Sequence, residues 1–508
     1  MAEPRYADAL NLESAHDRRL LGEVHPASWV DPEPPERYHL VVVGGGTAGL
    51  VCAAGAAGLG ARVALVERAL LGGDCLNHGC VPSKGVIRAA RAWHDARSAQ
   101  ARFGGPAAQG TGDFAAAMER MRGIRADISK HDSAARFASL GVDVFLGDGR
   151  FVASDAVEVN GKRLRFRRAV VATGGHAAVL PIPGLAEAGF LTNETVFSLD
   201  RLPPRLAAVG AGPIGCELAQ AFARFGSRVT LLDQEPRILA REDADAAALV
   251  EKALVADGVE LRLGVKVSAV EKRGEDKVLV IEGEGGRQEL AVDAILLAVG
   301  RQPNVEGLGL EAAGVEYDRK GVTTDDRLST TNPRIFACGD VCSKHQLTHA
   351  ADAQARIVIQ NAFFFGRRKT SQLVMPWATY TSPEIAHVGL YEQEARQRGI
   401  AVDTLTIPLS SVDRALLDDD SEGFLRLHLK KGGDKILGAT LVSEHAGDVL
   451  AEIYLAATHG IGLGKIASVI HPYPTVAEAI KKAADTWRRG KLTPTVKKLF
   501  AAWFRLLR

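Results

Sequence analysis

A strand–turn–helix–strand pattern with three glycines at fixed spacing occurs twice in this chain of 508 residues, and no other feature constrains the fold as strongly. Each copy opens with a continuous apolar run, Leu40–Val43 and then Leu206–Val209, as expected of a buried parallel strand. The motif Gly-x-Gly-x-x-Gly, a helix and a second apolar run follow. The second runs end at Glu67 and Asp233, and the motif glycines are Gly44, Gly46, Gly49, Gly210, Gly212 and Gly215.

The complete unit is the pattern of a dinucleotide-binding domain. Its first glycine makes the tight turn, the second lets a pyrophosphate approach the backbone at the helix N-terminus, and the third allows the helix to pack closely on the strand. The terminal acid would accept hydrogen bonds from a ribose. One Gly-x-Gly-x-x-Gly alone would be weak support, but two complete units predict two dinucleotides. The simplest interpretation is one electron carrier that stays bound and one that visits.

Two cysteines, Cys75 and Cys80, follow the first unit closely. The apolar and small residues of Val86–Trp93 predict a helix, and both cysteines are expected in its first turns. Because a helix N-terminus carries partial positive charge and free N–H groups, it favours a thiolate, so the pair is interpreted as a redox-active dithiol. The alternatives are two buried cysteines or half of a zinc site. Zinc ligands usually come two residues apart with a second pair elsewhere, which the sequence lacks, so no metal site is expected.

The run Gly72–Lys84, GGDCLNHGCVPSK, resembles the active-site segment of the class I pyridine nucleotide-disulfide oxidoreductases. This family includes dihydrolipoamide dehydrogenase, glutathione reductase and mercuric reductase. The glycine pair, both cysteines, the proline and the lysine match, whereas Asp74 stands where threonine is common. The resemblance extends over nearly the whole chain. It implies a redox-active Cys75–Cys80 disulfide.

The resemblance also implies an α/β fold, with two Rossmann-like domains that bind FAD and NAD(P) and a C-terminal α+β dimerisation domain. The expected bounds are 38–175 and 300–371 for the FAD domain, 176–299 for the NAD(P) domain, 372–490 for the dimerisation domain, 1–37 for an N-terminal surface arm and 491–508 for a basic amphipathic helix.

Further segments match the family's cofactor contacts. Ala169–Gly175 and Ile295–Asn304 match the segments that cross between domains, Asp340 matches the acid that holds the flavin ribitol, and Leu347–Ala350 matches the stretch beside the flavin ring. Cys338 and Cys342 are expected to be mostly structural. Besides the acids and glycines of the two repeated units, the resemblance places at the cofactors Lys84, Thr173, Gly174, Gly300, Asp340 and His349.

The resemblance implies a path in which reduced nicotinamide passes a hydride to FAD and the flavin reduces the disulfide. Cys80 would hold the thiolate beside the flavin, and Cys75 would exchange with the substrate. Lys84 would lie near flavin N5 and pair with Glu217, the acid just after the second glycine motif. NADH is expected to be preferred because carboxylates at Asp233 and Glu235 repel a 2′-phosphate, although Arg237 is close enough to blunt the preference.

The C-terminal motif departs from the disulfide-handling relatives. They carry histidine immediately before the proline and a glutamate that orients it, and donate both across a homodimer to the partner's cysteines. Here the glutamate is Glu478, but the base position holds Tyr473, and His471 lies two positions earlier. A phenol with a pKa of ~10 is a poor base near neutral pH, where an imidazole of ~6.5 is well matched. Lipoamide or glutathione chemistry is therefore not expected.

Mercuric reductases also carry tyrosine at this position, and the C-terminal half resembles that branch most. Those enzymes end in a vicinal cysteine pair, and many begin with a metal-capture domain, whereas nothing after Cys342 is cysteine here. The first hypothesis is therefore a mercuric reductase-like flavoenzyme that reduces a small-molecule or metal-ion acceptor. The alternatives are a membrane-associated NADH:quinone or dye reductase, and a flavin redox sensor or electron-supplying subunit for a protein partner.

Charge and composition limit the classes of partner and the compartment expected for the protein. Lys plus Arg number 62 and Asp plus Glu 61, which does not suggest a nucleic-acid binder. Six cysteines, no signal-peptide pattern and no apolar run of membrane-spanning length predict a cytoplasmic protein. After Pro494, an apolar stripe with basic flanks predicts a helix that either rests weakly on an anionic membrane surface or packs on its own protein. The stripe comprises Val496, Leu499, Phe500, Trp503 and Leu507.

Overall fold

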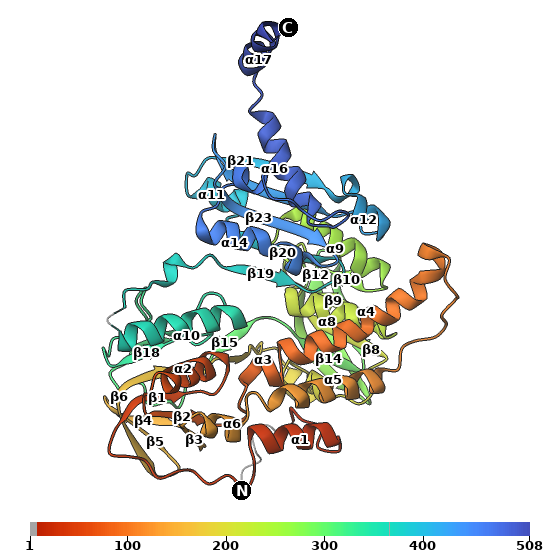
Figure 1. Cartoon of the computed structure of the whole chain (residues 1–508). Helices are drawn as coiled ribbons and strands as arrows, with labels where there is room; N and C mark the ends of the chain where they lie inside the picture. Colours follow the sequence, from red (N-terminus) through yellow and green to blue (C-terminus); the bar gives the residue numbers. More distant parts are fainter. Residues whose placement is uncertain (1–7, 365, 508) are drawn as a thin grey trace. The chain divides into compact units, whose positions relative to one another are not determined.

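The computed structural model describes residues 8–364 and 366–507 and divides into two compact units (Figure 1). The dinucleotide unit comprises the chain up to Gln100, Pro106–Ile238 and Asp257–Gln372. The C-terminal unit comprises Ala101–Gly105, Leu239–Ala256 and the chain from Leu373. Residues 239–256, which the sequence assigns to the NAD(P) domain, thus group with the C-terminal unit. No helix in the described ranges combines the length and apolar character needed to cross a membrane.

The first dinucleotide fold is a parallel sheet whose central strands contain the buried apolar runs Leu40–Val43, Val63–Val66 and Ala169–Val171. Its strand order is β3 (Val142–Leu146), β2 (Val63–Glu67), β1 (Tyr38–Val43), β6 (Lys162–Val171) and β18 (Ile335–Ala337). The first half of β6 pairs antiparallel with β5 (Ala156–Val159), which pairs with β4 (Arg150–Ala153). The helices of this part are α2 (Thr47–Gly58), α3 (Gly73–Asn77), α4 (Cys80–Phe103), α5 (Phe114–Ser129), α6 (Ala134–Ser139) and α10 (Thr348–Phe363).

The second dinucleotide fold repeats the same strand–helix–strand unit, as the sequence predicts. Its parallel sheet has the order β10 (Glu260–Arg262), β9 (Arg228–Leu232), β8 (Arg205–Val209) and β14 (Ala294–Leu297), and α8 (Pro213–Arg224) follows β8. The remaining elements of the dinucleotide unit are short strands, an antiparallel sheet of β11, β12 and β13, and one helix. They are β7 (Gly175–Ala177), α7 (Leu185–Ala188), β11 (Lys266–Arg273), β12 (Asp276–Gly283), β13 (Gly286–Val292), β15 (Arg301–Pro303), β16 (Tyr317–Asp318) and β17 (Gly321–Val322).

The two glycine turns have nearly the same geometry. Gly44 has φ +109° and Gly210 has φ +107°, in the region that favours glycine. A Cβ on Gly44 would lie 2.3 Å from the Ala172 carbonyl oxygen, and one on Gly210 would lie 2.4 Å from that of Ala298. Both positions therefore require glycine for conformation and for space.

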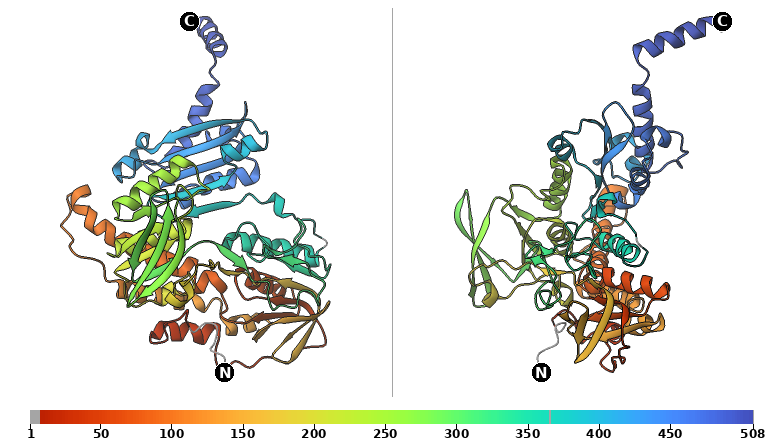
Figure 2. Two further views of the ribbon diagram at one scale, coloured as in Figure 1. Left: turned by 180° about the vertical axis from the view of Figure 1, so that it is seen from behind. Right: turned by 90° about the vertical axis from the view of Figure 1, so that its left-hand side faces the viewer.

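The C-terminal unit is α+β and contains one antiparallel sheet, which confirms the predicted class of this region. The strand order is β19 (Pro376–Thr379), β20 (Glu384–Gly389), β23 (Ile436–Ser443), β22 (Phe424–Lys430) and β21 (Val402–Pro408). The helices are α9 (Ala244–Ala256), α11 (Glu392–Gln397), α12 (Asp413–Leu417), α13 (Ala446–Val449), α14 (Ala451–His459), α15 (Leu463–Ile466), α16 (Glu478–Gly490) and α17 (Pro494–Leu506). Glu242, just before α9, joins this unit by accepting a hydrogen bond from Trp377 Nε1 at 2.8 Å. Figure 2 shows α17 standing apart from the sheet.

The described part of the N-terminal arm contains helix α1 (Ala15–Val24), which packs on α5. Leu20 and Val24 are buried, and Asp17 Oδ1 forms an ion pair with Arg125 Nη2 at 2.6 Å in which both side chains are fully buried. Arg125 Nη1 also donates to the Asn77 carbonyl oxygen at 2.7 Å. The arm is therefore anchored in the interior of the dinucleotide unit, at the segment that lies between Cys75 and Cys80.

Candidate redox site

Cys75 and Cys80 lie in two successive helices and not in one. Cys75 belongs to α3, whereas Cys80 is the first residue of α4, so the expectation that both lie in the first turns of one helix is wrong for Cys75. Helix α3 ends at His78, whose N–H donates to the Asp74 carbonyl at 2.8 Å. A Cβ on Gly79 would lie 3.0 Å from that same carbonyl oxygen, so a side chain there would crowd the end of α3.

The surroundings of Cys80 favour its thiolate. A hydrogen bond from Cys75 contributes most to lowering the pKa of Cys80, to about 6, with further help from Thr348 and the Lys84 ammonium. Thr348 Oγ1 lies 3.4 Å from Cys80 Sγ and belongs to the first residue of α10, so the N-termini of α4 and α10 meet at this sulfur. The same sulfur–sulfur hydrogen bond, together with burial, raises the pKa of Cys75. The pair therefore holds its negative charge on Cys80 and its proton on Cys75.

Lys84 and Glu217 are brought together, although they are far apart in the sequence. Lys84 Nζ donates to Glu217 Oε2 at 2.8 Å, and the Glu217 side chain is only 5% exposed. Lys84 follows Cys80 by one helical turn in α4, and Glu217 lies in α8 of the second dinucleotide fold. This ion pair fixes an ammonium group close to the thiolate.

Arg301 links the cysteine segment to Asp340. Its Nη1 lies 3.3 Å from Asp74 Oδ2, and its Nε lies 3.4 Å from Asp340 Oδ2. Burial raises the pKa of Asp340 despite this partner. Asn193 Nδ2 donates to the other Asp74 oxygen at 3.0 Å, so Asp74 is held on both sides. Sequence reasoning noted both acids but missed their connection through Arg301.

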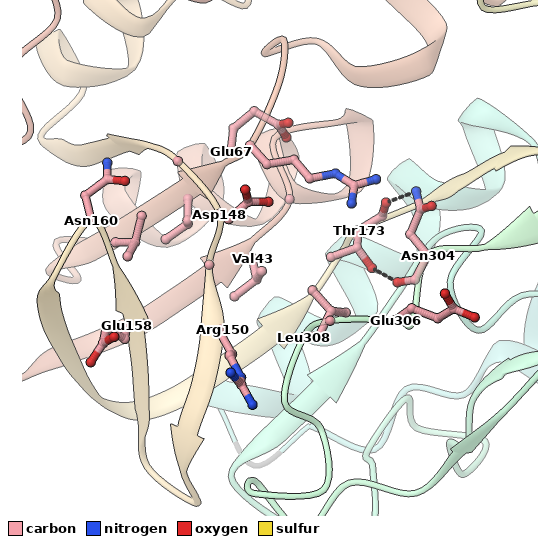
Figure 3. Close-up of a pocket in the computed structure, with 17 residues that line it drawn as sticks. Val43, Glu67, Asp148, Arg150, Glu158, Asn160, Thr173, Asn304, Glu306 and Leu308 are labelled. Atoms are coloured by element: carbon pink, nitrogen blue, oxygen red, sulfur yellow. Dashed lines mark hydrogen bonds between the residues drawn. The ribbon is translucent and has the colours of Figure 1, made fainter. Parts of the chain in front are cut away.

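The two crossing segments pair with each other, with β7 antiparallel to β15. Thr173 Oγ1 donates to the Asn304 carbonyl at 2.7 Å, and Asn304 Nδ2 donates to the Thr173 carbonyl at 2.8 Å (Figure 3). Gly174 and Gly300 both have positive φ, of +67° and +116°. The two segments that are expected to cross between the domains are thus hydrogen-bonded to each other beside the first glycine turn.

A polar pocket of about 350 Å³ opens at the carboxyl ends of β1 and β2. Figure 3 shows Glu67, Thr173 and Asn304 around it. Glu67 Oε2 accepts from the Gly45 N–H at 2.6 Å and Oε1 from the Ala69 N–H at 2.7 Å, while burial raises the pKa of this carboxyl group. The lining residues are Val43, Gly44, Val66, Glu67, Arg68, Gly147, Asp148, Gly149, Arg150, Glu158, Val159, Asn160, Thr173, Asn304, Glu306, Gly307 and Leu308.

The second fold repeats this carboxylate arrangement. Asp233 Oδ2 accepts from the Ala211 N–H at 2.5 Å, and Oδ1 accepts from the Glu235 N–H at 2.9 Å. Gly212 is the N-cap residue before α8 and Gly46 the one before α2, and neither offers a side-chain cap. Each helix N-terminus thus keeps N–H groups available for an anion.

The C-terminal candidates belong to the C-terminal unit, and of the three Tyr473 is the exposed one. Tyr473 is 70% exposed, and its hydroxyl donates to Asp413 Oδ2 at 2.8 Å, a contact that raises the pKa of the phenol. Glu478 begins α16, pairs with Lys482 at 3.2 Å and has a buried Oε2 without a hydrogen-bond partner among the described residues. His471 Nε2 lies 2.9 Å from Glu452 Oε2, so this ring nitrogen already has a partner.

The structure also places the three remaining residues that the sequence singles out, His349, Cys338 and Cys342. His349 follows Thr348 at the start of α10 and is exposed. Cys338 is buried with its sulfur 3.9 Å from that of Cys52, and Cys342 Sγ donates to the Gly339 carbonyl at 3.7 Å. Thr348 is the contact that sequence reasoning missed, although it lies inside the stretch already singled out beside His349.

Comparison with known proteins shows that the chain matches a known family. Residues 38–355 match the family described as pyridine nucleotide-disulphide oxidoreductase, and residues 375–484 match its dimerisation domain. The chain is 36% identical to a mercuric reductase of Staphylococcus aureus, over 89% of this chain and 82% of that protein. It is 34% identical to a dihydrolipoyl dehydrogenase of Thermus scotoductus, over 88% of this chain and 97% of that protein.

Two solved structures have a similar fold. One is the HOCl-induced flavoprotein disulfide reductase RclA from Escherichia coli, with a TM-score of 0.79 and 28% identity, covering 88% of this chain and 99% of that chain. The other is LpdA from Mycobacterium tuberculosis, with a TM-score of 0.81 and 26% identity at the same coverage.

Proposed function

Because the chain belongs to the pyridine nucleotide-disulphide oxidoreductases, an FAD-dependent enzyme family, we propose that it carries electrons from NADH through FAD and the Cys75–Cys80 pair to a small-molecule or metal-ion acceptor. The observation that carries the proposal is the charge distribution of the pair. Cys80 holds a thiolate beside Thr348 and Lys84, and Cys75 keeps the proton.

The residues present fit a bound FAD. Gly44 and Gly46 leave the turn before α2 without side chains, and the helix begins uncapped, so N–H groups are available for a pyrophosphate. The polar pocket of Figure 3 adjoins this turn and would take the adenosine end. Asp340 would hold the ribitol, with Arg301 fixing its position. When bound, FAD would accept a hydride from NADH and return two electrons to the Cys75–Cys80 disulfide.

The chain's own residues prepare the dithiol for exchange. The Lys84 ammonium, held by Glu217, favours negative charge on Cys80. After its proton leaves, the Cys75 sulfur would attack a substrate disulfide and displace one thiolate, or would coordinate a soft metal ion. The Cys80 thiolate would then attack the Cys75 sulfur and re-form the Cys75–Cys80 disulfide. This second step would release the other substrate thiolate, or the metal with the two electrons of its bond to sulfur. The remaining requirement is a group that takes the Cys75 proton.

In this proposal, the second half of the site comes from a second copy of the chain. The C-terminal unit matches the dimerisation domain of the family, and Tyr473 lies exposed on it. We expect light scattering to show a homodimer. If the active protein is instead a stable monomer, Tyr473 and Glu478 have no place in the site.

NADH should be the preferred donor, by about tenfold in kcat/KM, because Asp233 and Glu235 would repel a 2′-phosphate. Steady-state assays with NADH and NADPH measure this directly. The variant Glu235→Arg, which alters an exposed side chain, should move the preference towards NADPH. A wild-type preference for NADPH would contradict the assignment.

The thiolate should titrate near pH 6. Since the pKa of Cys80 is lowered to about 6, its sulfur is charged above that pH and neutral below it. The long-wavelength absorbance of a thiolate beside flavin in the partly reduced protein should therefore be lost on acidification through this range. Lys84→Gln should move the midpoint to higher pH, whereas Arg88→Gln, on an exposed side chain of the same helix, should not. Equal midpoints for both variants would contradict the role of Lys84.

Turnover with a panel of acceptors tests the proposed function itself. Disulfides, Hg²⁺, Cu²⁺, quinones and dyes should be compared at fixed NADH. Activity with soft metal ions or activated disulfides that exceeds activity with lipoamide and glutathione disulfide supports the proposal. Fast flavin reduction followed by slow turnover with every small acceptor would favour a protein partner instead.

A further inference from the structure

Helix α17 presents an apolar face that no described residue of its own unit covers. None of its thirteen residues, Pro494–Leu506, is buried. The large side chains are among the most exposed apolar groups of the chain, with Trp503 at 56% and Leu499 at 67%. Val496, Leu499, Phe500 and Trp503 line an open apolar hollow on one side of the helix. Figures 1 and 2 show this helix beyond the end of α16.

The helix is amphipathic and begins by its own local signals. Thr493 accepts a hydrogen bond from the Val496 N–H at 3.3 Å, and Pro494 occupies the first turn. At 100° per residue, the apolar side chains fall on one side and the lysines and arginine on the other. The apolar side comprises Val496, Leu499, Phe500, Trp503, Phe504 and Leu506, and the polar side comprises Lys497, Lys498, Ala501 and Arg505.

The charge around this face is almost entirely positive. Between Ala479 and Leu507 the only acidic residue is Asp485, and it pairs with Lys481 at 2.9 Å. None of Lys497, Lys498 and Arg505 has an ion-pair partner in the part of the chain that the structure describes. The basic residues of the stretch are Lys481, Lys482, Arg488, Arg489, Lys491, Lys497, Lys498 and Arg505.

We propose that α17 binds the surface of an anionic lipid bilayer, with its apolar side among the acyl chains and its lysines and arginine at the headgroups. Thirteen residues rise about 20 Å, less than the roughly 30 Å of the hydrocarbon core, so the helix lies along the surface. A second copy of α17 is a poorer occupant, because it is basic itself and offers no anionic groups to the lysines and arginine. This inference does not rest on the proposed function, since it concerns no residue of the redox site.

Co-sedimentation of the full protein with vesicles tests the proposal. The protein should bind vesicles of phosphatidylcholine with phosphatidylglycerol, remain in solution with phosphatidylcholine alone, and be released by high salt. Lys497→Ala with Lys498→Ala should weaken binding about 30-fold, at the usual contribution of a basic residue near such a surface.

A matched pair of variants tests the apolar side and the polar side of α17 separately. Trp503→Glu and Ala501→Glu introduce the same charge on opposite sides, so the first should abolish binding and the second only weaken it. Trp503 fluorescence should shift to shorter wavelength with anionic vesicles, and this shift should vanish in Trp503→Phe, which still binds.

Three outcomes would overturn the proposal. They are no sedimentation with anionic vesicles, equal binding to both lipid compositions, and equal loss in the two glutamate variants. A further result would assign the apolar face to a contact between copies of the chain. In that case the chain truncated after Lys491 would change from dimer to monomer, and the intact protein would not bind vesicles. Each readout is independent of turnover, so it does not depend on the outcome of the acceptor panel.

Discussion

Replacing Cys75 by serine should abolish reduction of every acceptor that needs the dithiol, by a factor on the order of 10⁴ or more, because the attacking nucleophile is lost. The same variant should display the thiolate–flavin absorbance without added reductant, since Cys80 can no longer form the disulfide. A serine hydroxyl can donate the hydrogen bond that Cys75 gives to Cys80, the largest contribution to its low pKa, and Thr348 and Lys84 still favour the negative charge. Turnover assays and absorbance spectra of the purified protein measure both effects.

Cys80→Ser is the matched control. It removes the sulfur on which the charge lies, so turnover should fall equally while the long-wavelength absorbance disappears. Cys342→Ser should change neither, because Cys342 contacts the Gly339 carbonyl and not the pair. A Cys75→Ser protein without the absorbance at any pH would show that the roles of the two sulfurs are misassigned.

Tyr473 should make the enzyme a slow thiol–disulfide catalyst, and Tyr473→His should accelerate that reaction by about 10²-fold. The hydroxyl of Tyr473 donates to Asp413, which raises the pKa of the phenol and makes it an even weaker acid at neutral pH. A positioned general base typically contributes 10²–10⁴-fold, and an imidazole titrates near neutral pH. Glu478 Oε2, which has no hydrogen-bond partner among the described residues, could orient the new ring. Steady-state turnover with dihydrolipoamide compares the two proteins.

Stopped-flow traces locate the affected step. Tyr473→Phe should leave flavin reduction by NADH unchanged and slow only the reoxidation that follows. His471→Ala is the appropriate control, since His471 pairs with Glu452 and should not supply the base. Rapid turnover of the wild-type protein with lipoamide near neutral pH would refute the argument. If Tyr473→Phe leaves the reoxidation rate unchanged, Tyr473 serves only in packing.

The repeated glycine unit made the fold predictable, because its requirements are local. Gly44 and Gly210 each need a positive φ and an absent Cβ next to a carbonyl oxygen, and those needs are visible in the sequence as glycine at fixed spacing. The apolar strand runs beside them are equally local. Both dinucleotide folds therefore follow from the local pattern, whereas the α+β class of the C-terminal unit follows from the resemblance to the family.

The charge network of the site was less predictable, because its members are distant in sequence. Arg301 pairs with both Asp74 and Asp340, and no periodicity signals a contact of that kind. The break between α3 and α4 was missed for a different reason. The apolar pattern shows α4, whereas the end of α3 is marked only by the close approach of Gly79 to the Asp74 carbonyl.

The contact of Arg125 with Asp17 and the Asn77 carbonyl also bears on how the protein can be shortened. The family match begins at residue 38, so a truncation designed on it would discard Asp17 and leave the fully buried Arg125 without its carboxylate. Removing one partner of a buried ion pair costs about 3–5 kcal/mol. The loss would fall on the segment between the two cysteines, because Arg125 also holds the Asn77 carbonyl there. A fragment that begins at residue 38 should therefore be less stable than the full chain, and the first helix belongs in any expressed fragment.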